Sequence, residues 1–174
     1  IDNSINGSIY VYSSNIDGNT FSGSKLDTRY SFVYNNEVSS TNVYSYSDIQ
    51  KYVTYNGCTL DLGYYDYRYS RMLSSALYNI QFNNCSFPRF ASDVKDSNFI
   101  NCGPITVESG RAARESYICT GNYWGDINTV EIKSKGEGQN LSFITDYYED
   151  FNKSRVDYSK YKEVAIENAG YQGE

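Results

Sequence analysis

Histidine is absent from the sequence, and methionine, tryptophan and proline occur only once, once and twice in 174 residues. Histidine is the commonest general base near neutral pH and a frequent zinc ligand, so a catalytic cysteine lacks its usual partner. Long apolar runs are missing too, since none approaches the roughly 18 residues of a membrane-spanning helix. We therefore expect neither thiol catalysis nor membrane insertion.

The start of the chain also lacks a recognisable signal peptide. It reads Ile1-Asp2-Asn3, without methionine or a charged segment. From this we expect the chain to be part of a longer protein, and its length suits a single domain.

Composition and charge narrow the class of protein. The net charge is -6 and the pI is about 4.7, with Lys and Arg scattered, which argues against nucleic-acid binding. Twenty tyrosines supply much of the 40% apolar content. An interior built from so few aliphatic residues must be thin, so we expect an elongated fold.

The four cysteines, Cys58, Cys85, Cys102 and Cys119, follow one another at intervals of 27, 17 and 17 in the sequence. None forms a Cys-x-x-Cys pair, and without histidine a zinc site would need all four thiolates from distant segments. Two states remain open from the sequence: disulfides in an oxidising compartment, or a stack of buried free thiols.

A short pattern recurs along the chain: an apolar residue, a small or polar residue three positions later, and an apolar residue two further on. The matches are Ile16/Asn19/Phe21, Val33/Asn36/Val38, Val53/Asn56/Cys58, Phe82/Cys85/Phe87, Val94/Ser97/Phe99 and Ile118/Gly121/Tyr123. The intervals between their starts are 17, 20, 29, 12 and 24, and a mean near 20 is typical of a solenoid with one coil per repeat. The interval of 12 is too short, so one match is out of register. Asparagine suits the turns, since it tolerates left-handed backbone and forms ladders.

The last third of the chain carries a second signal. It contains Gly-Asn-Tyr-Trp-Gly-Asp at residues 121–126, then Thr-Val-Glu-Ile, an acidic and aromatic segment at 144–151, and Val-Asp-Tyr at 156–158. This series resembles the closing segment of secreted, adhesin-like members of the pectin-lyase-like superfamily. The resemblance implies an all-β fold, a right-handed parallel β-helix with a C-terminal cap containing a short helix.

This interpretation divides the chain into coils at residues 1–125 and a capping segment and tail at 126–174. An open solenoid end exposes strand edges and apolar interior, so it needs a cover. We expect the short helix at residues 145–152, with Tyr147, Tyr148 and Phe151 on one side and the acids facing water. Trp124 is expected at the mouth of the last coil.

Polysaccharide cleavage is the commonest chemistry that the resemblance implies. Acids and guanidinium groups occur together at residues 108–115, where Arg111, Arg114 and Glu115 are the candidate catalytic residues. The same residues also fit a solvated turn with ordinary surface ion pairs, which we favour.

Tyrosines form a second candidate site. In the run at residues 64–69, strand alternation puts Tyr65, Tyr67 and Tyr69 on one face and Arg68 on the other. Rings with hydroxyl tips suit sugars and protein surfaces. The alternative is that one tyrosine face packs against the coils within a long insertion.

A calcium site at Asp146, Glu149 and Asp150 is disfavoured because the spacing matches no EF-hand loop. We therefore expect no metal and no cofactor. The hypothesis from sequence is a non-catalytic, secreted or cell-surface module that binds a carbohydrate or protein surface ligand. A divergent polysaccharide-active enzyme and a purely structural spacer remain the alternatives.

Overall fold

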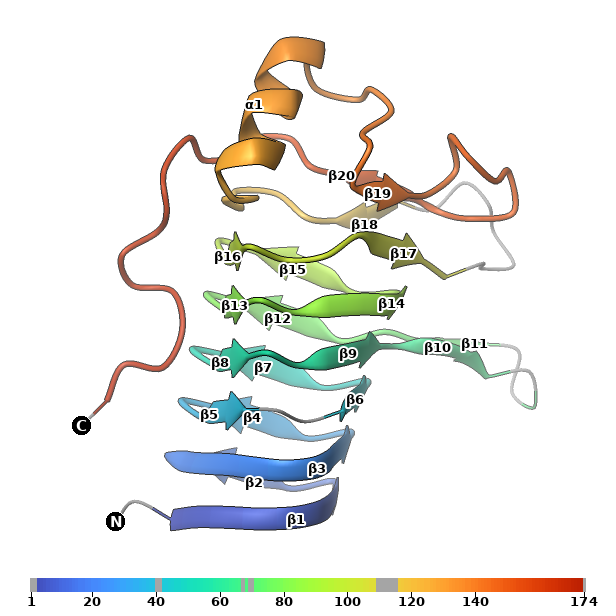
Figure 1. Cartoon of the computed structure of the whole chain (residues 1–174). Coiled ribbons are helices and arrows are strands. Elements are labelled where there is room, and N and C mark those ends of the chain that lie inside the picture. The colour runs from blue at the N-terminus through green and yellow to red at the C-terminus, as the bar shows by residue number, and fades with distance from the viewer. Residues whose placement is uncertain (1–2, 40–41, 67, 69–70, 109–115, 174) are drawn as a thin grey trace.

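The chain folds into a parallel β-solenoid of about six turns with one short helix near its C-terminal end, as expected (Figure 1). The computed structural model describes residues 3–39, 42–66, 68, 71–108 and 116–173. No helix among these residues is long and apolar enough to cross a membrane.

Each coil contributes strands to three rows. The first row contains the first parts of β1 (Asn3–Tyr12) and β3 (Asn19–Arg29), then β5 (Glu37–Ser39), β8 (Thr54–Asn56), β13 (Gln81–Asn83) and β16 (Asn98–Ile100). The second row contains the second parts of β1 and β3, then β6 (Asn42–Tyr46), β9 (Thr59–Leu62), β14 (Ser86–Phe90), β17 (Ile105–Val107) and β19 (Ile144–Thr145). The third row contains β2 (Asn15–Asp17), β4 (Phe32–Tyr34), β7 (Ile49–Lys51), β12 (Ala76–Tyr78) and β15 (Asp93–Lys95).

Four strands and the helix lie outside these rows. The hairpin β10 (Tyr64–Asp66) and β11 (Arg71–Leu73) follows β9. Strand β18 (Ser116–Ile118) pairs with β20 (Arg155–Asp157), and α1 (Asp126–Lys135) stands above the last coil (Figure 1).

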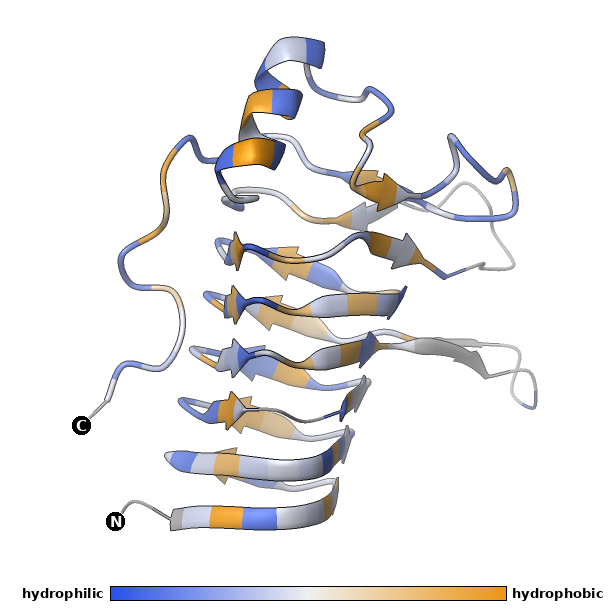
Figure 2. Cartoon of the chain, in the orientation of Figure 1, coloured by the Kyte–Doolittle hydropathy of each residue, from blue (hydrophilic) through white to orange (hydrophobic). Residues whose placement is uncertain are grey.

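The true repeat of the coils is shorter than the mean predicted from the sequence. Asn19 and Asn36, which bond to each other from successive coils, are 17 residues apart. Strand pairing aligns Ile16 with Val33 at the same separation. The coil after Asn36 also repeats after 17 residues, and the one that follows is longer: Asn56 and Asn83 are 27 residues apart, because the hairpin β10–β11 is inserted there. Figure 2 shows apolar positions recurring in the strands of successive coils.

The register corrects two of the predicted matches. Val33 pairs with Gln50, so the match that starts at Val53 is three residues out of register. Gln50 in turn pairs with Leu77, so the match that starts at Phe82 is five residues out, which explains the impossible interval of 12. Gln50 is a polar residue at a fully buried core position, so a search for apolar residues does not find this position.

Asparagine stabilises the corners in two ways. The backbone is left-handed at Asn35, Asn79, Asn84 and Asn101, with φ between 51° and 53°. Asn36 is fully buried; its Oδ1 accepts from the Asn19 N–H at 2.9 Å and its Nδ2 donates to the Ile16 carbonyl at 3.0 Å. These bonds tie one coil to the next, as the asparagine ladders predicted from sequence require.

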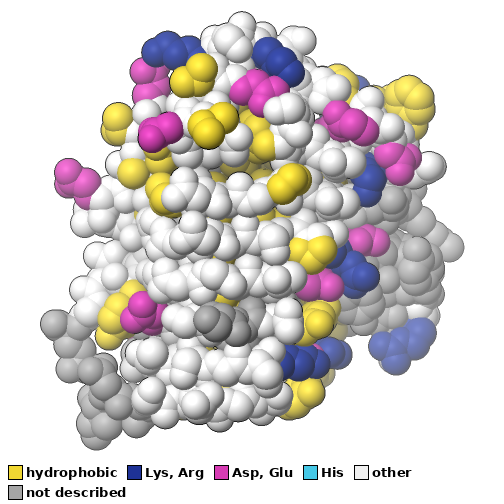
Figure 3. Space-filling model, viewed as in Figure 1, with side chains coloured by type: hydrophobic (Ala, Val, Ile, Leu, Met, Phe, Trp, Pro, Cys, Tyr) yellow, Lys and Arg dark blue, Asp and Glu magenta, His cyan; other side chains and the backbone are white. Residues whose placement is uncertain are grey.

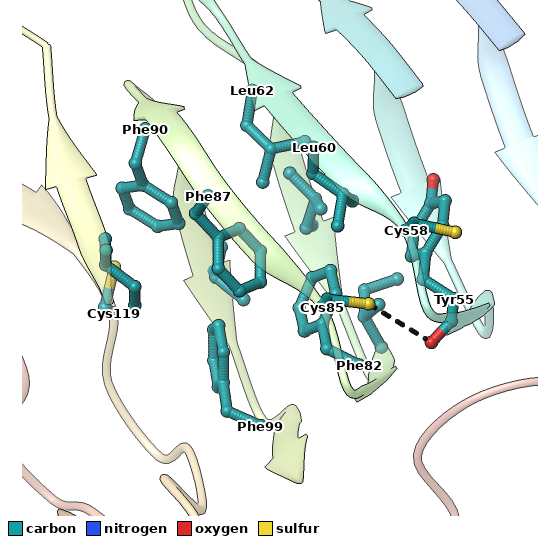
Figure 4. Close-up of a cluster of buried hydrophobic side chains, with 14 of the residues drawn as sticks. Tyr55, Cys58, Leu60, Leu62, Phe82, Cys85, Phe87, Phe90, Phe99 and Cys119 are labelled. Carbon is teal, nitrogen blue, oxygen red and sulfur yellow. Dashed lines mark hydrogen bonds between the residues drawn. The ribbon is translucent and has the colours of Figure 1, made fainter. Parts of the chain in front are cut away.

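An aromatic stack runs along the core. The ring centroids of Tyr55 and Phe82 are 5.6 Å apart and those of Phe82 and Phe99 are 4.8 Å apart (Figure 4). The centroids of Phe99 and Trp124 are 4.5 Å apart. Trp124 is 1% exposed and closes the stack at the last coil, as predicted. Burial of each such ring contributes about 2 kcal/mol, so stacking these rings compensates for a thin aliphatic core.

All four cysteines are free thiols. Cys58, Cys85 and Cys102 occupy the same position in successive coils, and each Sγ donates to a carbonyl of the preceding coil at 3.4–3.5 Å. Cys119 lies apart, with its Sγ 3.9 Å from the Ser92 carbonyl, so its regular spacing in the sequence does not reflect the stack. Of the two states left open by the sequence, the structure shows free thiols, three of them buried and that of Cys102 half-buried.

The cap differs from the prediction. Its helix begins at Asp126, and residues 145–152 form the end of β19 and turns. Asp146 is buried, not solvated: its carboxylate accepts from the backbone N–H groups of Tyr148 at 3.1 Å and Val156 at 3.3 Å. A local aspartate bond of this kind competes with a helix and favours a turn.

Candidate functional site

The residues predicted as catalytic cannot be placed. Arg111, Arg114 and Glu115 lie outside the described residues. Glu108, from the same segment, is described, and its carboxylate pairs with Arg89 at 3.1 Å.

The predicted tyrosine face is only partly described. Tyr67 and Tyr69 lie outside the described residues, and Tyr65 is described by its backbone, which pairs with Met72 in the hairpin. Arg68 is exposed in the turn between β10 and β11. The prediction of one strand from residue 64 to 69 is therefore wrong, because the chain reverses there.

A different surface brings tyrosines and charges together, on the outer side of the second row. In these strands Leu26, Val43 and Leu60 point into the core, so the alternate positions face outward. We call this surface the tyrosine–charge face; it comprises Tyr10, Tyr12, Lys25, Asp27, Arg29, Tyr44, Tyr46, Asp61, Arg89 and Glu108. Figure 3 shows basic, acidic and hydrophobic side chains together on the right-hand side of the molecule.

The face follows from the repeat. Strand pairing aligns Tyr10 with Asp27, Asp27 with Tyr44, and Tyr44 with Asp61, and each pair is separated by one coil repeat. Tyrosine and aspartate thus alternate along the solenoid axis. Sequence reasoning missed these residues because it looked for a run of neighbours; a search for polar residues at the period of the coils would have found them.

Asp27 forms the centre of the first charged cluster. Only 4% of its side chain is exposed; it accepts two hydrogen bonds from Arg29 and pairs with Lys25 at 3.3 Å. Burial acts to raise the pKa of Asp27, but the bonds and charges of Arg29 and Lys25 outweigh it and hold the pKa below its usual value. Asp27 is therefore a fixed negative charge.

Tyrosine rings flank this cluster. The Lys25 ammonium lies 4.6 Å from the Tyr10 ring centroid and 4.7 Å from that of Tyr44, and Arg29 lies 5.3 Å from that of Tyr46. Cation–π contacts of this kind orient the rings. Tyr10 and Tyr12 remain 68% and 67% exposed, so most of their surface is open to a ligand.

A second charged cluster lies further along the same face. Arg89 contacts Asp61 at 3.2 Å and Glu108 at 3.1 Å, so two carboxylates share one guanidinium. Burial raises the pKa of Asp61 to about 6, against the lowering charge of Arg89. Its Oδ1 atom is buried without a hydrogen-bond partner among the described residues.

The donor chemistry of the face suits polar organic ligands. Within the part of the chain that the structure describes, no three His, Cys, Asp or Glu side chains gather as a metal site. The face presents rings, hydroxyl groups and guanidinium groups, which stack on sugar rings and donate to their hydroxyl or carboxylate oxygens.

Comparisons with protein-family models, with curated proteins and with solved structures gave no match.

Proposed function

We propose that this chain is a non-catalytic binding module of a secreted or cell-surface protein, of the pectin-lyase-like, adhesin-like type. The tyrosine–charge face is its ligand-binding surface, and a carbohydrate is the preferred ligand. The observation that carries the proposal is the exposure of Tyr10 and Tyr12 beside the fixed charges of Lys25, Asp27 and Arg29.

Preorganisation supports binding at this face. Strand pairing holds the backbone of β1 and β3, and ion pairs hold the charged side chains, so little freedom is lost when a ligand arrives. An exposed tyrosine offers a flat apolar surface with only two rotatable side-chain bonds. A sugar ring needs such a surface, together with polar groups at its edge.

Pairing of the charges supports a non-catalytic role. A general acid or base requires a pKa near the working pH, whereas Asp27 is held charged by two cations. The first charged cluster therefore serves recognition.

A glycan array tests this proposal, with wild type beside the double variant Tyr10→Ala/Tyr12→Ala. Tyr34→Ala is the matched control, because Tyr34 is also exposed but belongs to the third row. We expect wild type and the control to bind the same glycans and the double variant to lose them. Identical binding by all three chains contradicts the assignment of the face.

We include the tyrosine run at residues 64–69 in the same proposal, as an extension of the binding surface. Tyr64 starts β10 two residues after β9 ends, so the hairpin continues directly from the second row. The variant Tyr65→Ala/Tyr67→Ala on the array tests whether Tyr65, Tyr67, Tyr69 and Arg68 extend the binding surface. Unchanged binding limits the surface to the coils.

Polysaccharide cleavage is a second candidate function, favoured by the cluster of Asp61, Arg89 and Glu108. A carboxyl group with a pKa near 6 is suited to protonate a leaving group, and a second carboxylate close by is suited to act as a base. Release of reducing ends from acidic and neutral polysaccharides tests it, with Asp61→Asn and Glu108→Gln as controls. If neither glycan binding nor cleavage is found, the structural-spacer alternative remains.

A further inference from the structure

The C-terminal tail, residues 159–173, leaves the cap and runs back along the side of the coils toward the N-terminal end (Figure 1). Its backbone meets one coil after another. The N–H groups of Lys162 and Gly170 donate to the carbonyls of Asn122 and Asn79 at 2.8 and 2.7 Å. The tail therefore crosses the corner that precedes the first row.

Side chains of the coils form hydrogen bonds with the tail backbone. Asn98 binds Ile166 at two points, accepting from its N–H at 2.8 Å and donating to its carbonyl at 2.9 Å. Further down, Thr54 Oγ1 accepts from the Tyr171 N–H at 2.8 Å and Asn35 Oδ1 from the Gln172 N–H at 3.0 Å. We call this surface the tail strip; it comprises Asn35, Thr54, Asn79, Gln81, Asn98 and Asn122.

The strip is selective at one position of the tail. Gly170 is buried with φ of 92°, and a Cβ atom there would lie 2.5 Å from Thr54 Oγ1 and 2.6 Å from Gln81 Cβ. Only glycine fits this contact and this backbone conformation. The strip therefore recognises a segment with a glycine four residues after the residue that Asn98 binds.

The start of the tail is fixed by Tyr161, which packs against the core, and by the Lys160 N–H, which donates to Glu137 at 2.8 Å, whereas the residues just after it are exposed. Val164 is 73% exposed, and the pair Lys133–Glu163 lies on the surface at 2.9 Å. An exposed ion pair contributes little. Because the cap tethers the tail beside the strip, the effective concentration of the tail at the strip is in the mM range.

We propose that the tail strip is also a docking site for the tail of a second copy of this chain, so that two molecules exchange tails. The partner is this same sequence because the strip matches both the Ile166 backbone and the missing side chain of Gly170. A tail that leaves its own strip and docks on a second molecule forms the same contacts again. Only the segment between the cap and Ile166 must then take a different course.

Complementation between two full-length variants tests the proposal. Gly170→Ala has an intact strip and a tail that no longer fits, whereas Asn98→Ala/Thr54→Ala has an intact tail and a damaged strip. We expect each variant alone to be monomeric in native mass spectrometry and in sedimentation. An equimolar mixture is expected to form a one-to-one complex that neither variant forms alone.

Two further measurements keep the outcome decisive. Hydrogen exchange at Ile166 and Gln172 must rise in each variant; protection unchanged in Gly170→Ala would overturn the steric argument.

If the strip variant does not fold, a labelled peptide of residues 162–173 replaces it, titrated into full-length Gly170→Ala. We expect this peptide to bind Gly170→Ala at least tenfold more tightly than it binds the wild-type chain. A peptide that itself carries Gly170→Ala is expected to bind at least tenfold more weakly. A mixture that stays monomeric, or a peptide that binds neither chain, contradicts tail exchange.

Discussion

Arg29 holds Asp27 through two hydrogen bonds, from Nε to Oδ1 at 2.9 Å and from Nη2 to Oδ2 at 3.1 Å. The two residues are neighbours on the outer side of one strand, β3, so the pair needs no loop to position it. A charged group fixed in this way on a rigid strand provides a defined partner for a ligand beside the exposed rings.

Removal of the Asp27 carboxylate is expected to destabilise the fold. Asp27→Ala removes the carboxylate that Arg29 and Lys25 share, and a lost bond to a charged group costs about 1.5–3 kcal/mol. Urea unfolding measures the free energy change. The control Asp17→Ala, at an exposed position of β2, is expected to change it by less than about 0.5 kcal/mol. Equal losses in the two variants contradict a structural role for the cluster.

Asp61 is expected to make stability depend on pH. Its pKa rises from 3.8 to about 6 on folding, so the native state binds this proton more tightly than the unfolded chain. The free energy of unfolding from this group is therefore highest below the unfolded pKa and falls as pH rises through the window between 3.8 and about 6. In Asp61→Asn this part of the dependence disappears. Urea unfolding at several pH values measures it, and identical profiles for the two chains would exclude a raised pKa.

Asn36 is expected to be among the most sensitive polar residues. Asn36→Ala removes the acceptor for the Asn19 N–H and a donor to the Ile16 and Tyr34 carbonyls, and of these three groups the Tyr34 carbonyl keeps a bond from the Gly18 N–H at 3.4 Å. The Asn19 N–H and the Ile16 carbonyl lose the partner that Asn36 provides. Each such group costs about 1–3 kcal/mol. Thermal unfolding is the measurement, with Asn15→Ala at an exposed position as control. A midpoint as high as that of the control shows that the ladder is dispensable.

The thiols are expected to react in order of exposure. Cys102 is half-buried and the neighbouring Cys85 thiol lowers its pKa, whereas Cys119 is fully buried and burial raises its pKa. A chromogenic disulfide reagent should therefore give one early phase in native protein, which Cys102→Ser removes. The remaining thiols should react only on unfolding. An early phase that persists in Cys102→Ser indicates a different order.

The all-β solenoid and its closing tryptophan were predictable because both follow from local signals: short alternating strands, asparagine turns and the Trp124 segment. The period was not, since Gln50 occupies a core position and the inserted hairpin β10–β11 interrupts the regular spacing. The helix was predicted at the wrong residues because the Asp146 carboxylate accepts from the Tyr148 N–H, two residues on, and this bond favours a turn. The tyrosine–charge face joins residues from successive coils, so it became visible only when the register of the strands was known.

The central claim is that the tyrosine–charge face binds the ligand, and calorimetric titration with the strongest glycan from the array tests it most directly. Stacking on aromatic side chains contributes on the order of 1–2 kcal/mol, so we expect Tyr10→Ala/Tyr12→Ala to weaken binding at least about tenfold. Tyr34→Ala should keep the affinity of wild type. Equal affinity of the double variant and wild type, or a wild-type chain that binds no glycan at all, would contradict the account.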